Sequence, residues 1–217
     1  MNSSTETSAI RQVHDARPVV VYKLGGSLLD LPDLGERLRR IIESRPQTFP
    51  LVIVGGGPAA DLVRDWDRVH RLGEETAHWL ALRAMQLNER LVVALLPEST
   101  TVEGRLQARD AWHSRRIPVL STFEFLKSEE CGLPTLSDNY LSTGSMSSHR
   151  LPHRWDVTSD SIAAWIAMRW PARELILLKS TNEPANWREG STDFVDPMFA
   201  RIVGDALEVT VCNLRHG

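Results

Sequence analysis

The chain lacks the features that mark several classes of protein. It has 217 residues but only two cysteines, Cys131 and Cys212, far apart and without metal-ligand spacing, which favours a reducing, cytoplasmic setting. No apolar stretch reaches the roughly 18 residues that a membrane-spanning helix needs. A formal net charge of -3 lacks the basic excess typical of nucleic-acid binders. We therefore predict a cytoplasmic protein that binds neither nucleic acid nor membrane.

The amino terminus also lacks a recognisable targeting signal. Residues 1–16 are polar and have no apolar core of the kind found in signal peptides, so we expect them to form a flexible tail. The chain has no internal repeat and no low-complexity segment. The length of residues 17–217 suits one large α/β domain with an ample core.

Two common phosphate-binding motifs, GxxxxGK[ST] and GxGxxG, are absent as well. Two glycine clusters are present instead, each directly after an apolar run: PVVVYKLGGS at residues 18–27 and PLVIVGGGP at residues 50–58. Glycine at the carboxyl end of a strand lets the backbone approach a ligand, and its N–H groups can hold an anion. Lys23 adds a positive charge before the first cluster. This combination points to phosphate handling, whereas ordinary turns and an edge lysine are the simpler alternative.

The hydrophobic pattern alternates between strands and helices. Helix starts are marked by Asp33 and by Thr158 or Ser159 as N-caps, and Pro58 suits the first turn of a helix. This alternation predicts an α/β fold, a three-layer α/β/α sandwich with a mostly parallel central sheet. We expect strands at 19–24, 51–54, 91–96, 117–120, 175–178 and 207–211, and helices at 33–43, from the GGG run to about 70, 74–90 and 159–169.

Four blocks together resemble the amino acid kinase family: VVYKLGGSLLD, LVIVGGGPAAD, VTSDSIAAWIA and LILLKST. Their order and spacing match that family over about residues 18–181. The resemblance implies an ATP-dependent kinase with the amino acid kinase fold, an acceptor-binding N-terminal part and a nucleotide-binding C-terminal part. We also expect a homo-oligomer.

The resemblance assigns roles to the matching residues. Lys23 would neutralise charge on the transferred phosphoryl group, and Asp160 would orient Lys23 and Lys179. The chain departs from many members after Lys179, reading STNEPANW where they carry Asp-Gly-Val. Backbone donors to the ATP phosphates would come from the turn of Gly25, Gly26 and Ser27, and donors on the acceptor side from Gly55, Gly56 and Gly57.

Two further blocks, GEETAHWLALRAM and RWDVTSDSIAAWIA, look most like the small kinases of methanofuran-type cofactor biosynthesis. That resemblance implies an aminomethyl-furanmethyl phosphate as the acceptor. The segment HRLPHR, residues 149–154, carries Arg150 and Arg154, which suit bidentate binding of phosphate or belong to a solvated basic loop. His78 is either an acceptor contact or a partly buried histidine. Trp79, with Glu74 or Glu75, would suit the cationic end of such an acceptor.

Phosphoryl transfer needs alignment and charge neutralisation more than a general base. We expect the cofactors ATP and Mg²⁺, the metal being held largely by ATP phosphates and water, and we predict no metal site made of protein side chains. Two alternatives stay open. One is a kinase of the same fold that acts on a carboxylate, using Arg64, Arg68 or Arg71. The other is a non-catalytic member that binds nucleotides or anions.

Overall fold

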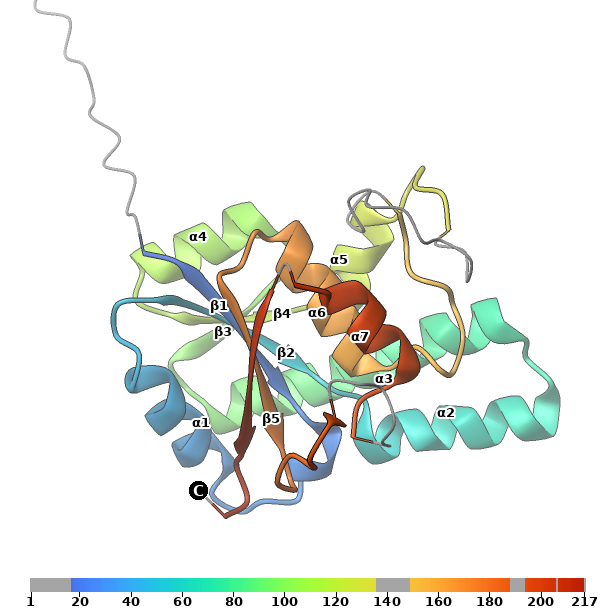
Figure 1. The fold of residues 1–217 in the computed structure, drawn as a ribbon, viewed down its shortest axis with the longest axis horizontal. Helices are drawn as coiled ribbons and strands as arrows, with labels where there is room; N and C mark the ends of the chain where they lie inside the picture. Colours follow the sequence, from blue (N-terminus) through green and yellow to red (C-terminus); the bar gives the residue numbers. More distant parts are fainter. Residues whose placement is uncertain (1–16, 136–148, 188–193, 206, 217) are drawn as a thin grey trace, which may run out of the picture.

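A sheet of six strands forms the centre of the molecule (Figure 1). The computed structural model describes residues 17–135, 149–187, 194–205 and 207–216. The strand order is β3-β4-β2-β1-β5-β6, and every pairing within this sheet is parallel. The predicted α/β class is therefore confirmed. The strands are β1 (Val19–Leu24), β2 (Phe49–Val54), β3 (Ser99–Val102), β4 (Ile117–Leu120), β5 (Glu174–Lys179) and β6 (Glu208–Asn213).

Helices cover both faces of the sheet, which gives the expected three layers (Figure 1). Successive side chains of a strand point to opposite faces, so β1 contributes Val21 to one apolar cluster and Tyr22 to the other. The first cluster lies against α4, α5, α6, α7 and the first half of α3, and the second against α1 and the end of α3. The helices are α1 (Leu34–Glu43), α2 (Gly57–His70), α3 (Glu74–Leu95), α4 (Arg105–His113), α5 (Thr122–Glu129), α6 (Ser159–Arg169) and α7 (Pro197–Val203), with a 3₁₀ turn η1 (Gly26–Leu28).

The strand expected at 91–96 is wrong, because α3 continues to Leu95 and the next strand, β3, begins at Ser99. The apolar run keeps the helical period. Val92 packs on the core, whereas Leu91 and Leu95 are exposed, so the segment is not buried on both faces as a central strand would be. Helices α4, α5 and α7 were not expected.

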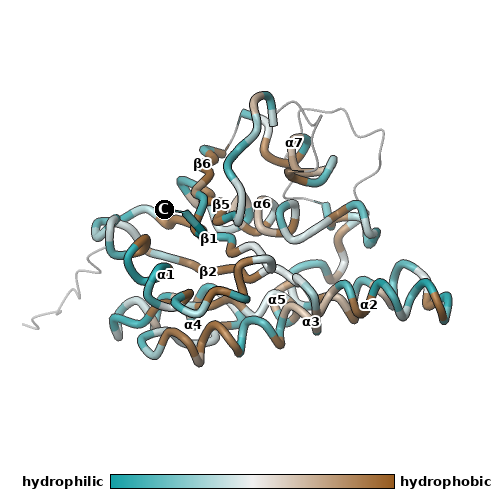
Figure 2. The backbone as a smooth tube through the Cα atoms, turned by 90° about the horizontal axis from the view of Figure 1, so that it is seen from below, coloured by the Kyte–Doolittle hydropathy of each residue, from teal (hydrophilic) through white to brown (hydrophobic). Residues whose placement is uncertain are grey.

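Helices α2 and α3 form a long hairpin that extends beyond the sheet (Figures 1 and 2). The hairpin carries exposed apolar side chains among polar ones, including Leu62 and Trp66 on α2. The GGG run opens α2, and this helix ends at His70, as predicted. Within the described ranges no helix is both long and apolar enough to cross a membrane. The predicted tail over residues 1–16 lies outside the described residues.

The two predicted helix caps differ in chemistry. The side chain of Thr158 accepts a hydrogen bond from the N–H of Asp160, as expected for the N-cap of α6. Asp33 occupies the N-cap position of α1, but its carboxylate accepts from Arg37 Nε at 2.8 Å rather than from a backbone N–H. The sequence therefore predicted the position of both N-caps, but the capping hydrogen bond is present only at Thr158.

Candidate active site

Lys23 and Lys179 lie on neighbouring strands and face the same layer. In the register between β1 and β5, Lys23 pairs with Leu177, and Lys179 follows two residues later. Because side chains alternate along a strand, residues two apart point to the same face. Helix α6 covers that face. The two lysines, 156 positions apart in the sequence numbering, thus converge on the first turn of α6.

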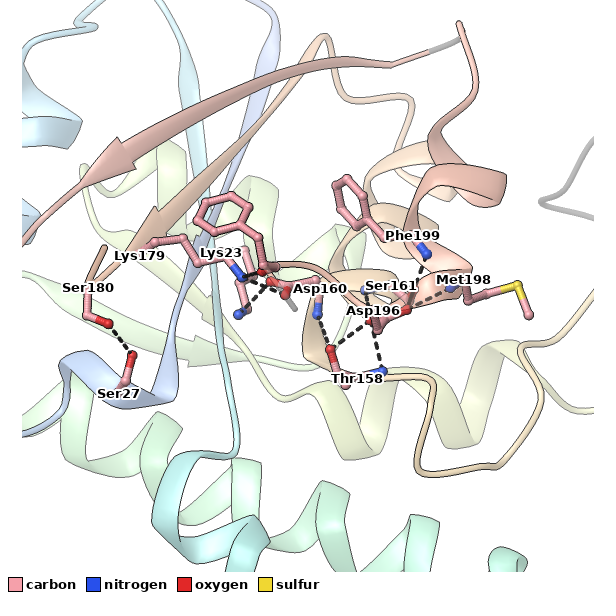
Figure 3. A network of polar contacts seen from close by, with 11 residues as sticks. Lys23, Ser27, Thr158, Asp160, Ser161, Lys179, Ser180, Asp196, Met198 and Phe199 are labelled. Carbon is pink, nitrogen blue, oxygen red and sulfur yellow. Dashed lines mark hydrogen bonds and ion pairs between the residues drawn. The ribbon is translucent and has the colours of Figure 1, made fainter. Parts of the chain in front are cut away.

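Asp160 joins the two lysines into one buried cluster (Figure 3). Its Oδ1 lies 2.7 Å from Lys23 Nζ, and its Oδ2 lies 2.7 Å from Lys179 Nζ. Burial acts to raise the pKa of Asp160, but the two lysine charges outweigh it and hold the pKa below its ordinary value. The carboxylate therefore stays ionised. With two ammonium groups it gives a cluster of net charge +1, which suits an anionic ligand.

Lys179 has a second acceptor in the backbone carbonyl of Phe194, 2.7 Å from its Nζ. Burial is the main influence on its pKa, and together with the charge of Lys23 it lowers the pKa below the usual value. The carboxylate of Asp160 opposes that shift. Both lysine side chains are therefore fixed in position, which is the arrangement that catalysis by charge neutralisation requires.

Asp196 holds the segment in front of α6, and sequence reasoning missed it. Its carboxylate caps α7, accepting from the N–H groups of Met198 and Phe199 at 3.1 and 3.2 Å (Figure 3). It also accepts from the N–H and hydroxyl of Thr158, at 3.0 and 2.7 Å, and from Ser161. This one carboxylate thus links α7 to the start of α6. The available signal was Asp followed by Pro, an N-cap before a first-turn proline.

The two glycine turns pack directly against each other. A Cβ on Gly26 would lie 2.2 Å from the backbone nitrogen of Gly57, and a Cβ on Gly57 would lie 2.7 Å from the carbonyl oxygen of Gly26. Gly57 also has a positive φ of 48°, which disfavours other residues. Close approach of the two turns is therefore sufficient to require glycine at both positions, apart from any ligand.

The backbone donors of these turns are only partly available. The N–H of Gly25 donates to Leu178 O at 2.9 Å, and that of Gly55 to Leu24 O at 2.8 Å. The expectation that these two groups face phosphates therefore needs correction, because strand-end hydrogen bonds already use them. Gly57 begins α2, so its N–H has no acceptor within that helix.

Polar side chains brace both turns. Asn88 on α3 donates to the carbonyls of Gly55 and Gly56 at 2.8 and 2.7 Å. The hydroxyls of Ser27 and Ser180 lie 3.0 Å apart, joining the turn after β1 to the turn after β5 (Figure 3). The predicted phosphate-binding residue Ser27 thus lies next to the segment that follows Lys179.

A pocket of about 170 Å³ opens beside the second glycine turn. It lies between α2, α3 and the segment before α6, on the side that the sequence assigned to the acceptor. Its lining includes apolar side chains such as Leu82, Met85 and Ile162. The charged lining side chains are Asp61, Arg64, Glu74 and Arg154, so cationic and anionic groups both face the space.

Some predicted acceptor residues meet in this pocket and others do not. Gly56, Gly57, His78 and Arg154 line it. Arg150 is not among the lining residues and instead donates to Thr135 Oγ1 at 2.8 Å.

The expected pair of Arg150 and Arg154 is thus not assembled around the pocket. Arg64 takes the second arginine position, and its guanidinium lies 4.7 Å from the ring centre of Trp155. Trp79 and Glu75, proposed for the cationic end, also fall outside the lining, whereas Glu74 is part of it. His78 is buried, and burial is the main cause that lowers its pKa to about 3, so its ring is neutral.

Comparisons with known proteins identify the family and the fold. The sequence matches the amino acid kinase family over residues 18–183. No curated protein matched. A uridylate kinase from Archaeoglobus fulgidus has a similar structure, with a TM-score of 0.58, 18% identity and coverage of 88% of this chain and 89% of that one.

Two further solved structures share the fold. UMP kinase from Bacillus anthracis gives a TM-score of 0.57 at 15% identity, covering 91% of this chain and 88% of that one. Carbamate kinase from Giardia lamblia bound to AMP-PNP gives 0.54 at 9% identity, covering 93% and 94%. The family match spans most of the chain and includes both glycine turns, Lys23, Asp160 and Lys179. The chain therefore belongs to the amino acid kinase family and is a phosphotransferase of that fold.

Proposed function

We propose that this enzyme transfers the γ-phosphoryl group of ATP to a small phosphomonoester. The observation that carries the proposal is the buried cluster of Lys23, Asp160 and Lys179 beside the two glycine turns. Charge spreads over the phosphoryl oxygens in the transition state, so two positioned ammonium groups supply the stabilisation that the reaction needs. A phosphate acceptor is already ionised and needs no general base.

Asp160 acts in this scheme as a positioning residue. Both of its oxygens are engaged by the lysines, which leaves it unsuited to bind a metal or to accept a proton. We expect Mg²⁺ to be held by the phosphates of ATP and by water, where it neutralises further negative charge. The nucleotide would lie over the turns after β1 and β5, where Ser27 and Ser180 meet.

The pocket beside the second glycine turn is the proposed acceptor site. Arg64 and Arg154 suit a phosphate, and Glu74 suits a cationic group at the other end of the acceptor. A volume of about 170 Å³ suits a small acceptor. An aminomethyl-furanmethyl phosphate of methanofuran-type cofactor biosynthesis combines these properties, and we propose it as the acceptor.

The decisive experiment is an assay of ADP release with Mg²⁺ and ATP against a panel of acceptors. Aminomethyl-substituted phosphomonoesters should react fastest, and the matched compounds without the amine should have a higher KM. Free carboxylates should not react. Turnover of a carboxylate without turnover of any phosphomonoester would overturn the proposed acceptor class.

Two arginines allow a matched test of the acceptor site. Arg64→Ala should raise the acceptor KM about tenfold or more, because a charge-assisted hydrogen bond is worth about 1.5–3 kcal/mol. Arg150→Ala serves as the control, since Arg150 does not line the pocket, and it should leave KM nearly unchanged. The ATP KM should be unaffected in both variants. A larger effect of Arg150→Ala would return the phosphate to the HRLPHR segment.

A carboxylate acceptor is the second candidate, because Arg64 is also the residue that such an enzyme would need. An amino acid carries both a carboxylate, which Arg64 would bind, and an ammonium group, which Glu74 would bind. Its product is an acyl phosphate, which hydroxylamine traps as a hydroxamate. Hydroxamate formation in the panel assay would therefore identify this alternative.

We further propose a homo-oligomer, as expected from the sequence. Exposed apolar side chains on α3, Leu87, Leu91 and Leu95, follow one another at helical spacing. Light scattering coupled to size exclusion will give the mass in solution. A mass of 24.4 kDa, that of one chain, at micromolar concentration would contradict the proposal.

A further inference from the structure

A second buried polar cluster lies beside the acceptor pocket and outside the Lys–Asp–Lys cluster. It consists of His78 on α3, Glu130 at the end of α5 and His153 in the segment before α6. All three side chains are more than nine-tenths buried. One ligand atom from each lies within 4.8 Å of the others. Three metal-binding side chains from separate parts of the sequence are thus gathered in one place.

Two atoms of this cluster lack a protein partner. Within the described part of the chain, His78 Nε2 and Glu130 Oε1 are buried and make no hydrogen bond. A buried polar atom without a partner costs about 1–3 kcal/mol, so such atoms are rare and call for an explanation. His153 Nε2 faces the other oxygen of Glu130 at 3.0 Å. A cation between these groups would satisfy the unpartnered atoms.

The far side of His153 is already organised as in a metal site. Its Nδ1 lies 2.7 Å from Glu75 Oε2, and Glu75 Oε1 accepts from Trp79 Nε1 at 2.7 Å. A carboxylate bound to the second ring nitrogen fixes the ring orientation and makes the first nitrogen a better ligand.

We propose that His78, Glu130 and His153 bind a Zn²⁺ ion, with Glu75 as the supporting carboxylate. Two imidazoles and a carboxylate form a known zinc ligand set, whereas Mg²⁺ prefers oxygen ligands. The carboxylates of Glu75 and Glu130 offset the charge of the ion.

Binding requires a local adjustment. The rings of His78 and His153 are stacked, with centroids 3.8 Å apart and planes 5° apart, and they must tilt to share one ion. The spread of up to 4.8 Å must contract to roughly 3.3 Å, the ligand spacing that bonds of 2.0–2.1 Å imply in a tetrahedron.

The consequence of this site is structural and separate from the identity of the acceptor. The ion would tie α3 and the end of α5 to the segment that carries Arg154 and Trp155 into the pocket. His78 itself lines the pocket, so the ion would fix one wall of it. The inference goes beyond the proposed function and holds for either acceptor class.

The test uses the full-length protein after removal of metal with a chelator. Co²⁺ is added and followed by its visible d–d absorption, and Zn²⁺ and Mg²⁺ are then added as competitors. We expect one Co²⁺ per chain, displacement by Zn²⁺ and no displacement by excess Mg²⁺. Zn²⁺ should also raise the Tm of the wild-type protein. Absence of Co²⁺ absorption, or displacement by Mg²⁺, would overturn the proposal.

Conservative variants localise the site. Glu130→Gln should weaken Co²⁺ binding at least tenfold, and the exposed Glu103→Gln is the matched control with unchanged binding. Glu75→Gln, which removes only the supporting carboxylate, should weaken binding about 10–100-fold. Circular dichroism checks that each variant folds. If Glu130→Gln does not fold, the Co²⁺ affinity of Glu75→Gln tests the site. Equal binding in wild type and both site variants would also refute the site.

Discussion

Asp160 and Glu89 are both almost fully buried, and the carboxylate of each is close to the first turn of a helix. Asp160 belongs to the first turn of α6, whereas Glu89 reaches from α3 to accept the N–H of Thr122, the first residue of α5, at 2.9 Å. Asp160 faces two ammonium groups. Glu89 faces a backbone N–H and a hydroxyl, with Arg90 as a weaker charge.

These neighbours give the two groups opposite protonation behaviour. Burial is the largest influence on both pKa values and raises each. At Asp160 the charges of the two lysines outweigh burial, and the pKa of Asp160 is lowered. At Glu89 the hydrogen bonds from Thr122 and the charge of Arg90 are too weak to do so, and the pKa of Glu89 rises to about 7. Within the described residues, Glu89 Oε2 and Thr122 Oγ1 are buried without a hydrogen-bond partner, so the Glu89 carboxylate has too few donors to offset its burial. The neighbours of Asp160 thus keep it charged, whereas Glu89 is about half protonated near pH 7.

Asp160→Asn removes the charged member of this pair, and we expect it to have the largest effect on stability. The variant leaves two buried ammonium groups without a counter-charge, so the free energy of unfolding should fall by about 3–5 kcal/mol near pH 7. The folded pKa is lowered, so this contribution is present above the ordinary value of 3.8 and is lost as pH falls through the folded pKa.

Urea unfolding measures the effect of Asp160→Asn. Asp65→Asn, which breaks an exposed ion pair with Arg68, is the control and should change stability by less than about 1 kcal/mol. Equal stability of Asp160→Asn and the wild type would show that the lysines are not held by this charge.

Lys23→Met should separate catalysis from stability. Asp160 keeps Lys179 as a partner, and the net charge of the cluster changes from +1 to zero, so the fold should survive. The loss of one transition-state charge should lower kcat on the order of 10²–10³-fold. Lys127→Met removes an exposed lysine and provides the control. If Lys23→Met kept more than about a tenth of wild-type turnover, Lys23 would not be the catalytic cation.

Glu89→Gln should have the opposite sign to Asp160→Asn. The folded pKa lies above the ordinary value of 4.5, so the folded state binds more protons between these values, and stability falls as pH rises from 4.5 to about 7. The neutral amide removes this loss. The variant should therefore be more stable than wild type by up to about 3 kcal/mol at pH 8 and similar at pH 4. Urea unfolding at both pH values measures this, and a less stable variant at pH 8 would contradict a protonated Glu89.

Asp196→Asn should give the smallest effect. The amide keeps one oxygen that can cap α7 but loses the second acceptor, which binds the backbone and hydroxyl of Thr158. We expect a loss of about 1–2 kcal/mol, measured from thermal unfolding. The kcat should fall only slightly, because the charge of Asp196 is a minor influence on the pKa of Lys179. An unchanged Tm would mean that the link between α6 and α7 contributes nothing.

Local patterns made the central part of the site predictable. Continuous runs of Val, Ile and Leu identified β1 and β2, and a glycine cluster marked the end of each strand. Lys23, Asp160 and Lys179 each belong to a block whose residue order resembles the family. Their meeting follows from the parallel register of β1 and β5, which an α/β pattern implies.

Features that depend on tertiary packing were not predictable. Arg150 and Arg154 are equivalent in the HRLPHR segment, but the path of the loop places only Arg154 at the pocket. The helical surface of α3 continues through an apolar run that resembles a strand. His78, Glu130 and His153 have no common motif, since packing of three separate segments brings them together.

The central place of β1 also bears on how the chain assembles during synthesis. Strand β1 pairs with β2 on one edge. Its other edge pairs with β5, which begins some 150 residues later in the numbering. Until then a growing chain exposes an unpaired edge next to side chains that are buried in the finished protein. Translation at about 5–20 residues per second makes that interval roughly 8–30 seconds. We therefore expect chains that stop before residue 174 to aggregate, and chaperones that bind exposed strand edges to raise the yield of full-length protein.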